Sequence, residues 1–169
     1  MSALQTRDWR PMLQMAYGAA QRSPDPSTQN GAILVRADDL AVFAIEYNRP
    51  PNGVPMSPER WERPLKYKWV EHAERNALFA LARSGAYSTQ GLTMVCPWAA
   101  CTDCARAIIQ CGIRALVTHR QAHDRSPDFW KSEIDIAFAM FQEAGVEVIM
   151  YDGVVGASSI LHSGKLWNP

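Results

Sequence analysis

Between residues 70 and 151, segments with helical periodicity alternate one by one with short apolar segments that are typical of strands. Helices are expected over Val70–Arg83, Thr102–Gln110 and Asp128–Glu143, and strands over Leu92–Cys96, Ile113–Thr118 and Val146–Tyr151. Strands joined through single helices favour crossover connections within one sheet, and both faces of such a sheet need helices to cover them. The alternation therefore predicts an α/β fold.

The N-terminal part of the chain adds one helix and two strands to this pattern. Apolar residues recur at helical spacing over Trp9–Ala20, and the helix is expected to end before Pro24. Gly31–Val35 and Leu40–Tyr47 are short and apolar, and the polar turn between them predicts a hairpin. The full expectation is a three-layer α/β/α sandwich with a central mixed five-stranded sheet.

The length of 169 residues favours one domain over residues 1–169. The proline-rich segment 48–64 excludes a regular helix or a central strand, and a loop this long is either functional or a surface insertion. The tail 152–169 is rich in glycine and serine, and we expect it to dock on the body or on a neighbouring subunit. Its apolar residues are Ile160, Leu161, Leu166 and Trp167.

Charge and hydropathy restrict the partners. Lys plus Arg number 17 and Asp plus Glu number 17, so the chain lacks the basic surplus of a strong nucleic-acid binder. No apolar run approaches the roughly 18 residues that a membrane-spanning helix needs. The residues from Met1 to Asp8 lack the basic and apolar regions of a secretory signal. We expect a cytoplasmic protein with no membrane partner, for which nucleic acid is a disfavoured partner.

Four residues suited to metal chemistry lie near the starts of two predicted helices. His72 and Glu74 lie at the first of these, and Cys101 and Cys104 at the next. Two cysteines at this spacing can both reach one metal ion from the first turn of a helix, and a histidine completes three protein ligands. Three ligands leave a fourth tetrahedral position for water, whereas a structural zinc site is closed by four. Glu74 would face that water as a carboxylate placed for proton transfer.

The Cys-x-x-Cys pair taken alone is also compatible with a redox dithiol or a buried pair. Its combination with His-x-Glu and with the intervening Pro97 is associated with zinc-dependent nucleobase deamination. Cys96 and Cys111, the remaining cysteines, are expected to be small buried hydrophobes.

Over about residues 9–153, the chain resembles the cytidine and deoxycytidylate deaminase superfamily, and specifically the deoxycytidylate (dCMP) deaminases. Besides Cys101-x-x-Cys104, the segments that carry the resemblance are Arg22–Val35, Tyr47–Asn48, Pro51–Val54, His72–Ala77 and Cys104–Ile113.

The resemblance implies one zinc ion per chain, bound by His72, Cys101 and Cys104, with Glu74 as the proton shuttle. In this family zinc lowers the pKa of its water, and the resulting hydroxide attacks C4 of cytosine. Glu74 would pass the proton to ring N3 and then to the leaving amine, which gives ammonia and a uracil nucleotide. The resemblance also implies that Asn48 and the backbone N–H of Ala73 contact the substrate.

The sequence departs from the family pattern at two places. Ala100 stands directly before the first zinc cysteine, where the family usually has proline, and Trp98 in the same segment either stacks on the base or packs in the core. Regulated members carry Gly-Tyr-Asn-Gly at an allosteric nucleotide site, where this chain has Glu46-Tyr47-Asn48-Arg49. Losing both glycines removes conformational freedom, so we expect no activation by dCTP and no inhibition by dTTP.

The expected function is hydrolytic deamination of dCMP to dUMP in pyrimidine nucleotide metabolism. Arg22 and Ser23 are the first candidates for contacts to the nucleotide. Further basic candidates are Arg49, Lys66, Lys68 and Arg125. The alternatives are a deaminase of another base, a nucleoside or tRNA, a zinc-stabilised interaction domain, and a thiol redox protein. We expect a homo-oligomer, for which a hexamer is one candidate state.

Overall fold

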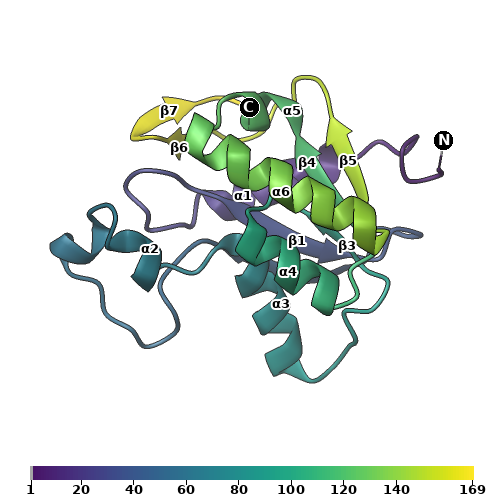
Figure 1. Ribbon diagram of the computed structural model, residues 1–169, viewed down its shortest axis with the longest axis horizontal. Coiled ribbons are helices and arrows are strands. Elements are labelled where there is room, and N and C mark those ends of the chain that lie inside the picture. The colour runs from purple at the N-terminus through teal and green to yellow at the C-terminus, as the bar shows by residue number, and fades with distance from the viewer. Residues whose placement is uncertain (1) are drawn as a thin grey trace.

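A five-stranded sheet with the strand order β2-β1-β3-β4-β5 organises the computed structural model, which describes residues 2–169 (Figure 1). Strands β1 and β2 form an antiparallel hairpin, β1 also pairs antiparallel with β3, and β3, β4 and β5 are parallel. A separate antiparallel hairpin of β6 and β7 lies near the C-terminus. The elements in chain order are α1 (Arg10–Ala20), β1 (Gly31–Val35), β2 (Val42–Tyr47), the 3-10 helix η1 (Pro58–Trp61), α2 (Lys66–Trp69), α3 (Ala73–Ser84), β3 (Thr93–Val95), α4 (Thr102–Gln110), β4 (Ala115–His119), α5 (Arg120–Asp124), α6 (Asp128–Ala144), β5 (Glu147–Tyr151), β6 (Ile160–His162) and β7 (Lys165–Trp167). The predicted α/β fold with a mixed five-stranded sheet is confirmed.

Two apolar cores cover the two faces of the sheet. Along β1, Ala32 and Leu34 pack into the core beneath α3, α4 and α6, whereas Ile33 and Val35 pack into the core beneath α1. This alternation follows from the two-residue period of a strand. In Figure 1, α4 and α6 cross in front of the sheet and α1 lies behind it. The result is the expected arrangement of helices on both faces.

Helix α1 packs closely against β1 because the strand begins with a glycine. A Cβ atom at Gly31 would lie 2.0 Å from the carbonyl oxygen of Ala16 on α1. Any side chain at this position would therefore push the helix away from the sheet. Close packing here places the segment before β1, residues 23–30, along the edge of the candidate site.

The C-terminal tail docks on the body through aromatic side chains of its β6–β7 hairpin. His162 stacks on Trp98 with ring centroids 4.5 Å apart, and Trp167 stacks on His119 at 6.0 Å. His119 is held in turn by Tyr17 on α1, whose hydroxyl lies 2.6 Å from Nδ1, and by the Gly153 carbonyl, 2.9 Å from Nε2. A carbonyl accepts only, so Nε2 donates and Nδ1 accepts from Tyr17. Burial lowers the pKa of His119, which fits this neutral ring.

Some short elements were not predicted. The sequence pattern does not indicate regular structure in the segments of α2, α5, β6 and β7. Each is only three to five residues long, too short for periodicity to identify it, and is held by tertiary contacts. No helix in residues 2–169 is long and apolar enough to cross a bilayer.

We predict that Phe141→Ala lowers the free energy of unfolding by about 3–5 kcal/mol, because Phe141 on α6 is 0% exposed and its loss leaves a cavity. Phe129→Ala on the same helix is the matched control. Phe129 is 67% exposed, so its change should stay within about 0.5 kcal/mol. Urea unfolding of the zinc-loaded protein measures both, and equal losses would contradict the assignment of the core.

Candidate metal centre and active site

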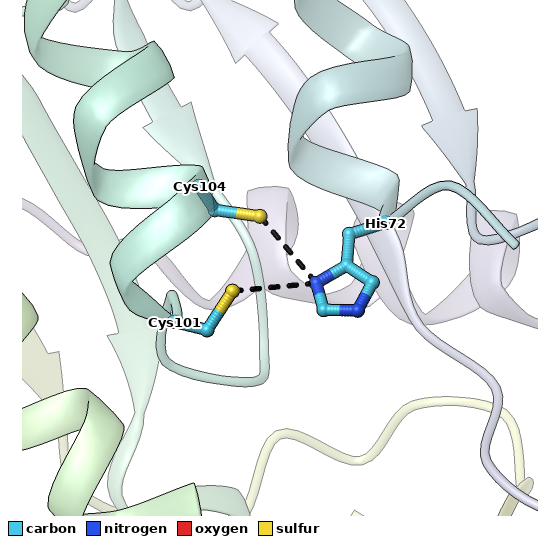
Figure 2. Close-up of side chains that lie close together, drawn as sticks. All are labelled: His72, Cys101 and Cys104. Carbon is cyan, nitrogen blue, oxygen red and sulfur yellow. Dashed lines mark hydrogen bonds between the residues drawn. The ribbon is translucent and has the colours of Figure 1, made fainter. Parts of the chain in front are cut away.

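Helices α3 and α4 bring three metal-binding side chains together at their N-termini. His72 is the N-cap of α3, Cys101 is the N-cap of α4, and Cys104 lies in the first turn of α4. Both cysteine sulfurs lie 3.5 Å from Nδ1 of His72 (Figure 2). Figure 2 shows the two sulfurs and this nitrogen pointing toward one another from the two helices. The sequence prediction that these residues form one cluster is therefore met by the geometry.

The three donor atoms have the spacing that a zinc ion requires. A tetrahedral zinc ion bonded to sulfur at about 2.3 Å and to nitrogen at about 2.1 Å holds those atoms about 3.6 Å apart. The sulfur-to-nitrogen distances of 3.5 Å agree with this value. The three atoms also lie within 4.8 Å of one another, and two thiolates with one imidazole are a donor set that favours zinc. The residues present therefore fit zinc.

The surroundings stabilise a thiolate at Cys101. A hydrogen bond from Cys104, aided by the nearby His72, lowers the pKa of Cys101 to about 4. Burial lowers the pKa of His72, but its hydrogen bond to Cys101 and the carboxylate of Glu74 outweigh burial and raise it. Both cysteines lie at the N-terminus of α4, where the helix dipole also favours negative charge. The hydrogen bond to Cys101 and burial raise the pKa of Cys104, so Cys101 is the ligand favoured as an anion, and binding of a metal ion would displace the proton of Cys104.

Glu74 is a buried carboxylate next to the metal-binding cluster. It lies in the first turn of α3, is 2% exposed and lines the same cavity as His72 and Cys101. Burial raises the pKa of Glu74 more than the neighbouring His72 lowers it. A carboxyl group whose pKa is raised toward neutrality can both accept and donate a proton near pH 7.

Asn30 contacts Glu74 and was not singled out from the sequence. Its side-chain nitrogen lies 3.5 Å from Oε2 of Glu74 and 3.2 Å from the sulfur of Cys96. Burial raises the pKa of Cys96 well above its ordinary value, so this neutral thiol can accept the hydrogen bond. Asn30 stands directly before β1, so the pairing of β1 with β3 brings it to Cys96 and the packing of α3 on β1 brings it to Glu74. No local sequence signal marks that contact.

His72, Cys101 and Glu74 line one cavity that opens to solvent. Its aromatic walls come from Tyr67, Trp98 and Trp130. The remaining polar lining residues come from distant segments, namely Asp25, Thr28, Asn30, Asn48, Arg63, Lys66, Ser126, His162 and Ser163.

One side of the cavity is held by a buried ion pair. Nζ of Lys66 on α2 lies 2.6 Å from Oδ2 of Asp25, and the two side chains are 7% and 0% exposed. Asp25 also accepts backbone hydrogen bonds from Ser27 and Thr28. Asn48 donates to the same carboxylate at 3.0 Å. These contacts fasten α2 and the end of β2 to the loop before β1.

Of the predicted substrate-contact residues, the structure places three on the lining of the cavity, namely Asn48, Ala73 and Trp98. The Asn48 amide also holds the backbone of Asn30 at 2.8 Å, and Ala73, as the first residue of α3, has a backbone N–H without an acceptor inside the helix. Trp98 is 9% exposed and donates to the Gln29 carbonyl, so it is both packed and part of the wall.

The structure does not bring Arg22 and Ser23 to this lining. Arg22 is exposed and lies over the ring of Tyr47, at 5.0 Å from its centroid. Ser23 is buried and donates to the Asn48 carbonyl at 2.7 Å. Instead, Arg63, Trp130 and His162 reach the cavity from segments outside the deaminase motifs. None of them belongs to a motif whose spacing indicates chemistry, so the sequence pattern does not single them out.

A three-ligand metal set beside a buried carboxylate defines the class of metal-dependent hydrolases with water at the open position. A family model described as the cytidine and deoxycytidylate deaminase zinc-binding region matches residues 7–120, which include all four of these side chains. The chain belongs to this cytidine and deoxycytidylate deaminase family. It is a hydrolase of the type that acts on a cytosine C–N bond.

Similar proteins support the family at the level of whole chains. The human protein named deoxycytidylate deaminase is 33% identical over 138 residues, which cover 78% of this chain and 72% of the human one. A protein of Aliivibrio fischeri named as an uncharacterized deaminase is 34% identical over 80% of this chain and 87% of its own. A dCMP deaminase structure from the cyanophage S-TIM5 shares the fold with a TM-score of 0.60 and 23% identity, over 89% of this chain and all of that one.

We predict that Lys66→Met lowers the free energy of unfolding by about 3–5 kcal/mol, because it leaves the Asp25 carboxylate buried without a counter-charge. Arg36→Met is the control, since the Arg36–Asp39 pair is about half exposed and should contribute about 0–1 kcal/mol. Chemical denaturation of both variants checks this. A loss for Lys66→Met no larger than that for Arg36→Met would refute the role of the pair.

Proposed function

We propose that this chain catalyses the zinc-dependent hydrolytic deamination of dCMP to dUMP and ammonia. The observation that carries the proposal is the buried Glu74 carboxyl beside the His72, Cys101 and Cys104 cluster, on the lining of a cavity that opens to solvent. The similarity to the human protein named deoxycytidylate deaminase supports dCMP as the substrate.

The residues around the cluster have distinct tasks in this reaction. When bound by His72, Cys101 and Cys104, zinc supplies the Lewis acidity that makes water nucleophilic near neutral pH. Glu74 would carry the protons: its carboxylate accepts one from water and delivers it to ring N3, and it then takes the proton of the hydroxyl added at C4 and delivers it to the amino group at C4. A C–O bond forms at C4, the C–N bond breaks, and ammonia leaves. The backbone N–H of Ala73 is available to the base carbonyl.

The charge balance favours a small nucleotide over a nucleic-acid strand. The 17 basic and 17 acidic residues leave no surplus for contacts to many phosphates. The cavity is also walled on several sides by Tyr67, Trp98 and Trp130, which suits a single enclosed base. Deamination of another base, a nucleoside or tRNA is the alternative that the substrate comparison below tests.

We predict that the zinc-loaded protein deaminates dCMP faster than deoxycytidine, dCTP or a single-stranded oligonucleotide. The loss of ultraviolet absorbance of the cytosine ring measures turnover. A chelator should abolish the activity and added zinc should restore it, because the nucleophile depends on the metal. Metal analysis should find about one zinc per chain.

Glu74→Gln is the matched control for this experiment, since it keeps the shape of the side chain and removes its proton chemistry. Turnover should fall at least about a hundredfold while the zinc content stays unchanged. Unchanged turnover would indicate a role in packing only and would contradict the mechanism. A zinc-loaded wild-type protein that deaminates no cytosine compound would leave a zinc-stabilised interaction domain as the better description.

We predict that dCTP does not activate this enzyme and that dTTP does not inhibit it. The segment Glu46-Tyr47-Asn48-Arg49 has no glycine, and Arg49 is paired with Glu46 at 3.1 Å in a largely buried contact. This pair adds rigid, charged bulk where a triphosphate would need open backbone. Substrate saturation curves with and without each nucleotide measure the effect. A several-fold shift of the curve by either one would refute the prediction.

A further inference from the structure

We propose that the part of the cavity lined by Arg63, Thr28 and His162 is the subsite that binds the 5′-phosphate of the substrate. The inference rests on the proposed function, because it assigns a contact for a nucleotide in that same cavity. It differs from the sequence expectation, which pointed to Arg22 and Ser23.

Arg63 is the cation on this lining that remains available for an anion. The other one, Lys66, has its ammonium group on both oxygens of Asp25, at 2.9 and 2.6 Å. Among residues 2–169, no carboxylate lies within ion-pair distance of Arg63. Its guanidinium donates to the Ser27 hydroxyl at 3.1 Å. The other donors of the planar guanidinium can bind a phosphate in the two-pronged manner typical of arginine.

The turn of the β6–β7 hairpin contacts Ser27, which Arg63 also contacts, and the neighbouring Thr28. The backbone N–H of Gly164 donates to the Ser27 carbonyl at 2.7 Å, and that of Ser163 donates to the Thr28 hydroxyl oxygen at 3.2 Å. Ser27 therefore contacts Arg63 with its side chain and the hairpin with its backbone. Because the Thr28 hydroxyl accepts from Ser163, its own hydrogen is free to point toward a ligand.

His162 adds an imidazole ring to the part of the cavity that Arg63 and Thr28 line. It lines the cavity, and its ring is held by stacking on Trp98 at 4.5 Å. In the described part of the chain, neither ring nitrogen of His162 has a hydrogen-bond partner, so one nitrogen can donate to a ligand. Burial, with the positive charges of Arg125 and Arg63, lowers the pKa of His162. A neutral ring adds no repulsion to Arg63.

The chemistry along the cavity changes in the order that a nucleotide needs. The ring of Trp130 lies 6.0 Å from that of His72 and 5.7 Å from that of Tyr67, between their centroids. The Arg63 guanidinium lies 6.0 Å from the centroid of Tyr67, so the aromatic wall leads from the metal-binding cluster to Arg63. A base held at the metal would direct its sugar phosphate toward Arg63 and His162. His162 lies beyond the family match at residues 7–120, so this contact belongs to the chain's own tail.

The test compares dCMP with deoxycytidine, which differ only in the phosphate. Arg63→Met should raise KM for dCMP roughly tenfold or more, because a charge-assisted contact is lost, and leave kcat nearly unchanged. The kcat/KM for deoxycytidine should not change. Arg63→Lys should retain part of the effect, since it keeps the charge without the planar fork.

Two further variants separate the phosphate contact from a structural role. His162→Phe keeps an aromatic ring on Trp98 but removes the ring nitrogens, so KM should rise for dCMP alone. Arg114→Met is the charge-matched control, because Arg114 is exposed and lies far from the cavity. It directly precedes β4, whereas Cys101 follows the parallel strand β3, so the two residues lie at opposite ends of these strands. Its KM for dCMP should equal that of the wild type. Thermal unfolding checks that all variants are folded.

Two results would overturn the proposal: an unchanged KM for dCMP in Arg63→Met, or an equal loss for dCMP and deoxycytidine. If the wild type deaminates neither compound, the proposed function fails, and binding of dUMP and deoxyuridine by calorimetry then decides the subsite. Weaker binding of dUMP alone in Arg63→Met would still support it. Equal binding of dUMP by Arg63→Met and the wild type would refute it.

Discussion

The site depends on one constraint, namely that α3 and α4 begin next to each other on the same face of the sheet. Helix α3 packs on β1 and β2, α4 packs beside α3, and α6 packs on α4. Their apolar faces share one core with Leu34, Met94 and Leu116. Because the ligands are N-caps and first-turn residues, packing of the two helices sets the distances between His72, Cys101 and Cys104. The geometry required for zinc is thus a consequence of the hydrophobic core.

A second set of contacts builds the cavity around this centre. Asp25 receives hydrogen bonds from the backbone of its own loop, from Asn48 and from Lys66, and so joins three segments that are far apart in the sequence. Asn48 also holds the backbone of Asn30, which contacts Glu74. A buried carboxylate with these partners is costly to disrupt, because removal of one partner leaves a buried charge. The hydrogen-bond contacts that support Glu74 therefore extend through Asn30, Asn48 and Asp25 to Lys66.

Much of the fold could be predicted because strands and long helices carry periodic signals. The helix Thr102–Gln110 has the predicted bounds, and the hairpin of β1 and β2 forms as expected. His72, Glu74, Cys101 and Cys104 were found because their spacing itself encodes the chemistry. Asn30, Arg63, Trp130 and His162 carry no such spacing, and single polar or aromatic residues like these are typical of many surfaces. The sequence therefore indicated the reacting groups more completely than it indicated the residues that form the walls of the cavity.

By itself, the sequence determined the α/β pattern and pointed to His72, Cys101 and Cys104 as one metal-binding set with Glu74 beside it. These depend on local periodicity and on residues close together at helix starts, which short-range rules can detect. Only the tertiary structure decided that Arg22 and Ser23 lie off the cavity lining and that Arg63 and His162 lie on it. That outcome depends on how the loop before β1, the α2 segment and the C-terminal hairpin meet at Ser27 and Thr28. Contacts between segments more than thirty residues apart are settled by packing of the whole chain.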